Sequence, residues 1–179
     1  ELAVVVSGVA SMGLEILAGR LLAPTFGGSV YVWGSVIGVF LAALAVGYWI
    51  AGRLSAERAS RGALAFALVG AAAVVAVVML AAEGLIEATA GLPLPTRYAP
   101  LLPVTLLFGP PTLLLGFVSP YAAELVDARS TGDASGRVYA LGTGGSIVGA
   151  FATTFVLIPT LDVLAIGLGY GAVLVLAGL

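Results

Sequence analysis

One carboxylate in the chain lies where a charged group is costly. Glu15 follows fourteen mostly apolar residues, and an ionisable group inside a spanning helix costs about 2.5–3.5 kcal/mol even on insertion scales. Ser7 and Ser11 precede it at intervals of four residues, so in a helix the three side chains lie within about 80° of one another. Such a polar stripe could hold a cation or a proton. Alternatively, Glu15 is a structural carboxylate that a neighbouring helix satisfies.

Arg20 and the Pro110–Pro111 pair are further candidates for a binding site. Arg20 is five residues beyond Glu15, which is poor geometry for a pair within one helix, so it either snorkels to the interface or reaches another helix. The prolines remove two backbone donors, so we predict a break or strong kink near Gly109 to Pro111. Broken helices mark binding sites in transporters, although a kink can also serve packing alone. The candidate ligand-binding residues are therefore Ser7, Ser11, Glu15, Arg20, Pro110 and Pro111.

The composition restricts the class of protein. Hydrophobic residues make up 61% of the 179 residues and charged residues 9%, whereas soluble domains have about 45–50% and about 25%. The chain has no Cys and no His, so it lacks thiolate and imidazole metal ligands and cannot form a Ser-His-Asp triad. We therefore expect no metal, no cofactor and no catalytic residue. Its seven basic residues, all arginines, exclude a nucleic-acid-binding surface. An integral membrane protein in contact with the lipid bilayer remains.

The charge-free intervals define the helices that must position these residues. A spanning helix needs about 20 apolar residues to cross about 30 Å of hydrocarbon. Four uninterrupted intervals, 21–52, 62–82, 98–123 and 138–161, are long enough for one helix each. The segment before them is interrupted by two charges, and the one after them ends with the chain. We predict an all-α, polytopic bundle, a single transmembrane domain over residues 1–179, with the fourth helix broken at the Pro-Pro pair and six spanning helices at 2–22, 29–53, 63–83, 100–125, 138–158 and 163–179.

The arginines also predict the orientation. Loops 53–62 and 126–137 carry five arginines, whereas the loops expected on the other side carry only Arg97. Because short arginine-rich loops stay in the cytoplasm, we predict a multi-pass protein of the cell membrane with both termini cytoplasmic. Trp33 and Trp49 support this arrangement, because tryptophans are enriched at the two membrane interfaces. The 16 residues from one to the other correspond to about 24 Å along a helix.

Three pairs of glycines are spaced by four residues, at 34 and 38, 145 and 149, and 167 and 171. This spacing lets helix backbones approach closely. We interpret the pairs as packing within the chain, with a homodimer seam as the alternative. The glycine-rich stretch 142–149 lacks the glycine at Ile147 and the preceding strand that a dinucleotide-binding motif needs. It also lacks the glycine at Val148 and the His that a nucleophile elbow needs, so we interpret it as helix packing too.

Several segments together carry a resemblance to a known family: 15–22, 26–33, 40–41, 47–54, 111–120, 136–141 with Gly149, and 155–159. The chain resembles the amino-terminal membrane domain of spermidine-synthase-like proteins, in which a multi-helix membrane domain precedes a cytoplasmic aminopropyltransferase domain. It departs from that family at Leu14 and Ala18, where an aromatic residue and a Trp are usual, and at Gly142, where Asn is frequent. Loop 52–62 is also similar to a loop of major-facilitator transporters.

The resemblance implies a link to polyamines. The nucleotide-binding domain for aminopropyl transfer is absent from these 179 residues, so we expect no such catalysis by this chain, which begins without Met and ends in an apolar run as a fragment would. One hypothesis is a domain that binds or transports a small, cationic, polyamine-like solute. The alternatives are a non-catalytic anchor that docks a cytoplasmic aminopropyltransferase domain and a structural membrane module. A hydrated cavity at Glu15 would favour the first, and a dry, packed Glu15 the others.

Overall fold

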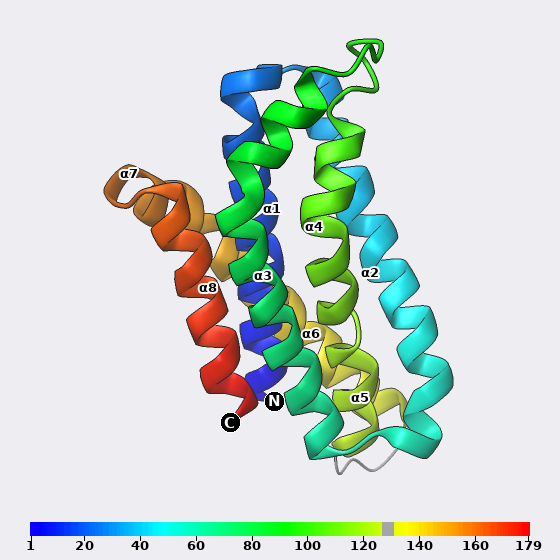
Figure 1. Cartoon of the computed structure of the whole chain (residues 1–179). Coiled ribbons are helices and arrows are strands. Elements are labelled where there is room, and N and C mark those ends of the chain that lie inside the picture. Colours follow the sequence, from blue (N-terminus) through cyan, green and yellow to red (C-terminus); the bar gives the residue numbers. More distant parts are fainter. Residues whose placement is uncertain (127–130) are drawn as a thin grey trace.

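The structure is a computed structural model that describes residues 1–126 and 131–179, and the described residues form a bundle of helices without a strand (Figure 1). The bundle is therefore all-α, as predicted. A short π-helix, η1, joins α6 to α7. In chain order the helices are α1 Leu2–Phe26, α2 Val30–Arg58, α3 Arg61–Ala90, α4 Leu101–Leu115, α5 Val118–Leu125, α6 Thr131–Ala152, η1 Thr153–Leu157, α7 Ile158–Thr160 and α8 Val163–Gly178.

The described helices have the length and composition of membrane spans. Five helical segments are long and apolar enough to cross a bilayer, and α8 is a shorter apolar helix of 16 residues. The structure thus gives five long spans where six were predicted, because α8 falls below the usual length. Both termini and the α2–α3 turn lie at one end of the bundle, here called the near end, opposite the α1–α2 connection at the far end (Figure 1). The five segments are Leu2–Phe26, Val30–Ser55, Arg61–Ala90, Leu101–Leu125 and Gly132–Thr160.

The bundle is organised around α1, which packs against α6 and also contacts α2, α3 and α8. The inner faces of α1, α2 and α4 meet in an apolar core. Phe40 and Phe108 are fully buried in it, with ring centroids 5.7 Å apart. Each helix is apolar nearly all round, so its sequence does not mark one face as the buried one. The side chains that pack into this core determine which helices are neighbours.

The predicted break at Pro110–Pro111 is wrong in its position. Helix α4 continues through both prolines and ends at Leu115, because the fixed φ of proline is close to the helical value and α4 is packed between α2 and α3. The interruption lies at Gly116–Phe117 instead. Pro120 explains it, since Pro120 has no N–H for the carbonyl of Gly116 and its ring crowds that carbonyl. The Phe117 N–H donates to the carbonyl of Leu114 at 3.1 Å, which closes the last turn of α4.

Several helix ends lie beyond the predicted ones. Helix α6 begins at Thr131, seven residues before the predicted start, and α3 runs from Arg61 to Ala90 rather than over 63–83. Charged residues mark where hydrocarbon ends, but a helix continues past that level until a residue caps it. Ser60 does so for α3, because its hydroxyl accepts a hydrogen bond from the N–H of Ala63 at 3.0 Å.

The glycine pairs on the last two long helices pack within the chain. A Cβ on Gly145 or Gly149 would overlap the backbone of α1, and a Cβ on Gly167 would overlap Met79 of α3. These two pairs therefore serve internal packing. A Cβ on Gly34 or Gly38 would meet nothing within 4 Å, so this pair on α2 has no partner helix in the described part of the chain.

Candidate ligand-binding cavity

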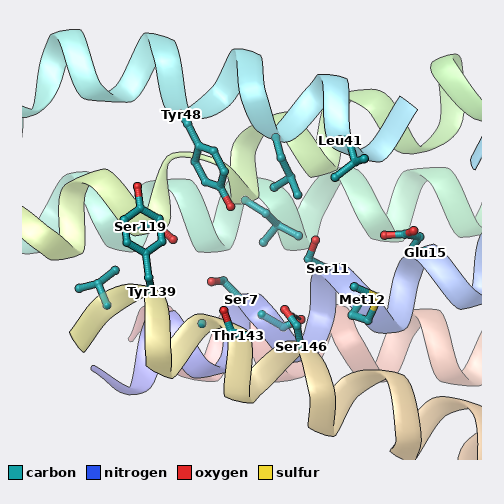
Figure 2. Close-up of a pocket in the computed structure, with 15 residues that line it drawn as sticks. Ser7, Ser11, Met12, Glu15, Leu41, Tyr48, Ser119, Tyr139, Thr143 and Ser146 are labelled. Atoms are coloured by element: carbon teal, nitrogen blue, oxygen red, sulfur yellow. Dashed lines mark hydrogen bonds between the residues drawn. The ribbon is translucent and has the colours of Figure 1, made fainter. Parts of the chain in front are cut away.

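A cavity of about 190 Å³ lies between α2 and α6, with α1 along its floor and the α4–α5 junction beside it. Residues Ser7 to Glu15 of α1 line it, and so do Leu41 to Tyr48 of α2 and Val138 to Ser146 of α6. These are the near-end halves of all three helices. Figure 2 shows the side chains of α2 and α6 pointing toward each other, with Glu15 at one end of the cavity. We call this space the Glu15 cavity.

The structure brings Ser7, Ser11 and Glu15 to this one cavity. Their spacing of four residues places them along one side of α1, because α1 is an unbroken helix from Leu2 to Phe26. Ser7 is 7% exposed and donates its hydroxyl to the carbonyl of Val4 at 3.0 Å. Glu15 is half-buried. Its carboxylate has no hydrogen bond or ion pair with any residue that the structure describes.

The lining of the Glu15 cavity is polar and carries one charge. Glu15 is the only ionised side chain of the described residues that line it. Ser146 donates to the carbonyl of Gly8 at 3.4 Å, which leaves its oxygen able to accept. A carboxylate surrounded by hydroxyl oxygens can accept several hydrogen bonds from an ammonium group or from water. The seven hydroxyl groups in the lining belong to Ser7, Ser11, Tyr48, Ser119, Tyr139, Thr143 and Ser146.

The cavity is open on the side that faces away from α1. Helices α2 and α6 do not pack against each other over the described residues; each packs on α1 and α5 instead. Leu41 and Tyr139, which line the cavity from opposite sides, are 60% and 64% exposed. Because lipid covers this side of a membrane-spanning bundle, water and solutes have to enter from an end.

The other candidate residues lie elsewhere. Arg20 lies outside the lining of the Glu15 cavity and toward the far end, where it lines one cavity with Glu83 and Glu87 and another with Gly19 and Trp33. Pro110 lines an apolar groove between α2 and α4, and Pro111 is buried in the packed face of α4. The structure therefore joins three of the six candidates and separates the other three from them.

Five polar residues in the lining, Tyr48 of α2 among them, had no place in the sequence-based site. Tyr139, Thr143 and Ser146 recur on one side of α6 at spacings of four and three residues, which is a detectable polar stripe. The glycines between them directed the interpretation to packing. Ser119 could not be found from spacing, because the interruption before α5 sets the direction in which it points.

The described residues contain no group of three or more Asp, Glu, His or Cys placed to hold a metal ion. Comparison of the chain with protein-family models, with curated proteins and with solved structures finds no match. Its class follows from the fold: a polytopic, all-α membrane domain with a polar cavity.

Proposed function

We propose that this membrane domain binds, and moves, a small cationic solute in the Glu15 cavity. One observation carries the proposal. The carboxylate of Glu15, which has no partner among the residues that the structure describes, lies inside a spanning helix and faces a cavity lined by seven hydroxyl groups. A carboxylate in this position is costly unless a cation, a donor or water reaches it. An ammonium group would supply both the opposite charge and three donors.

The size of the cavity supports a small solute. Its volume of about 190 Å³ is below the range of roughly 300–1,000 Å³ for pockets that hold drug-sized ligands. The resemblance to the membrane domain of spermidine-synthase-like proteins supports a polyamine-like cation. We propose polyamines as the class with which binding is tested first.

We also propose that the near end is cytoplasmic and that the domain lies in the cell membrane. Five of the six arginines outside the first helix belong to segments 53–62 and 126–137, where α2 is followed by α3 and α5 by α6 at that end, and arginine-rich short connections stay in the cytoplasm. Single cysteines at Ser60 and Thr96, in this chain without cysteine, should react with a membrane-impermeant thiol reagent from opposite sides. Reaction of both from outside would contradict this orientation.

A second candidate function is an anchor that docks a cytoplasmic aminopropyltransferase domain. It is favoured by the position of the C-terminus at the near end, beside the N-terminus (Figure 1). A domain joined there would lie on the same side as the arginine-rich loops. The open Gly34–Gly38 face of α2 would in either case suit a second copy of the chain.

Glu15→Gln tests the proposed site, because it keeps the shape of the side chain and removes its charge. We expect the affinity for spermidine, measured by calorimetry on the purified protein in nanodiscs, to fall at least about tenfold, since a hydrogen bond to a charged group contributes about 1.5–3 kcal/mol. Glu87→Gln at the exposed far end of α3 is the matched control and should bind as the wild type does.

Thermal unfolding of both variants separates binding from folding. A Glu15→Gln protein that stays folded and binds spermidine as tightly as wild type would refute the binding site. If Glu15→Gln is less stable than the wild type, and the wild type itself binds no spermidine, the anchor function is favoured instead.

A further inference from the structure

We propose that Trp33 is the far-end gate of the Glu15 cavity. The groove between α2 and α6 continues beyond Glu15 toward the far end, and the indole of Trp33 closes it there. Solutes and water then reach Glu15 from the near end only, until Trp33 moves. This inference rests on the proposed function in taking the Glu15 cavity as the binding site, but its test needs no ligand.

A second cavity shows that the groove continues. It has a volume of about 340 Å³ and begins at Ile16, the residue after Glu15. The same walls line it, with Gly19, Arg20 and Ala23 from α1, Val32 and Trp33 from α2, and Thr154 from η1, which extends α6. The two cavities thus follow one another along a single groove, the near-end one polar and the far-end one mostly apolar.

Trp33 lines the far-end cavity, with its indole over Gly19 and 40% of its surface exposed. It belongs to the first turn of α2, and a Cβ built on Gly19 would lie 2.8 Å from the Cη2 atom of its indole. Only glycine at position 19 leaves room for the ring. Gly19 follows Glu15 by four residues, about 6 Å along α1, so the indole covers the groove one turn beyond the carboxylate.

The bundle offers no other route from Glu15 to the far end within the described residues. Behind the carboxylate, α1 turns Leu14 and Leu17 into the core, and both are fully buried. Phe40 and Phe108 fill the space between α2 and α4, and they too are fully buried. Hydrocarbon bars water from the open side of the groove, so any path to the far end passes Trp33.

The test uses one cysteine in the cavity, introduced as Ser11→Cys, and a membrane-impermeant thiol reagent applied to either side of oriented proteoliposomes. We expect the introduced thiol to react from the near-end side only. Adding Trp33→Ala should raise the far-end reaction rate at least about tenfold and leave the near-end rate unchanged. Trp49→Ala is the matched control, because Trp49 lies on the same helix but stacks on Arg53, 4.0 Å from its guanidinium carbon, at the near end.

Gly19→Val is a second variant, since its side chain displaces the indole and leaves Trp33 in the sequence. We expect it to raise the far-end rate as well, and it answers the question if Trp33→Ala does not fold. Far-end reaction of the introduced thiol with Trp33 in place would overturn the gate. So would a far-end rate that neither folded variant raises. Spermidine binding is not measured in this experiment, so a failed gate and a failed binding site give different results.

Discussion

The two flanks of α1 differ in how closely their neighbours approach. On one flank α6 contacts α1 backbone to backbone, because added Cβ atoms on Gly8, Gly145 and Gly149 would overlap the carbonyl oxygens of the opposite helix. On the other flank α2 makes its close backbone approach to α4, at Gly47 and Gly116, and at the level of the Glu15 cavity it is separated from α1 by the cavity. The comparison shows that the position of the contacting glycines decides where the bundle is tight and where it has room.

Gly149→Val should give the largest effect, because it separates the tight flank. The added carbons would overlap the carbonyl of Val9, and overpacking of this kind costs typically about 1–3 kcal/mol. We expect a lower Tm in detergent, measured by circular dichroism. Gly144→Val is the matched control on α6, since a Cβ there meets nothing within 4 Å. Equal effects of the two substitutions would show that α1 and α6 are not held together by backbone contact.

Thr153→Val should give an intermediate effect at the far end of the same flank. The buried Thr153 hydroxyl donates to the carbonyl of Gly149 and forms a hydrogen bond with the Tyr170 hydroxyl of α8. Valine leaves the Tyr170 hydroxyl without this partner, which we expect to cost about 1 kcal/mol. Thermal unfolding measures the loss, and the exposed Thr154→Val serves as control. A double mutant with Tyr170→Phe that is no less stable than Thr153→Val alone would confirm the pair, whereas additive losses would refute it.

Ser11→Ala should give the smallest effect, because it lies on the open flank. The Ser11 side chain borders the Glu15 cavity, and its hydroxyl has no hydrogen bond with any residue that the structure describes. We expect the free energy of unfolding, from reversible denaturation in mixed micelles, to change by no more than about 0.5 kcal/mol. A loss as large as that from Gly149→Val would mean that the cavity flank is packed as tightly as the other.

The glycine pairs illustrate what could be predicted from the sequence. The spacing at 34 and 38 is identical to that at 145 and 149, yet only the second pair meets another helix. Spacing identifies the face on which two residues lie, but the neighbour of that face depends on how all the helices assemble. For the same reason the stripe of Ser7, Ser11 and Glu15 was predictable, whereas its neighbours Tyr48 and Ser119 on other helices were not.

The prolines illustrate a second limit of prediction from the sequence, which concerns where a helix breaks. The fourth helix carries Pro110, Pro111 and Pro120, and a count of lost donors favours a break at the pair. The structure continues through the pair and is interrupted at Gly116, one turn before Pro120. Packing against two helices maintains α4 at the pair. At Gly116, a residue without a side chain lets the backbone approach that of α2 closely, and Pro120 one turn later leaves the Gly116 carbonyl without a donor.

The turn between α7 and α8 gives the far surface of the domain a step. This turn lies well below the ends of α1 and α3 along the bundle (Figure 1). Asp162, which caps α8 by accepting from the Ala165 N–H at 2.8 Å, is therefore placed at a depth that lipid chains occupy elsewhere around the domain. Arg20 and Glu83 border a cavity together with Val163, the residue after Asp162. We therefore expect the bilayer to thin on this side, so that headgroups and water meet these charges. The domain should then be sensitive to acyl-chain length, with longer chains exposing charged groups on this one side to hydrocarbon.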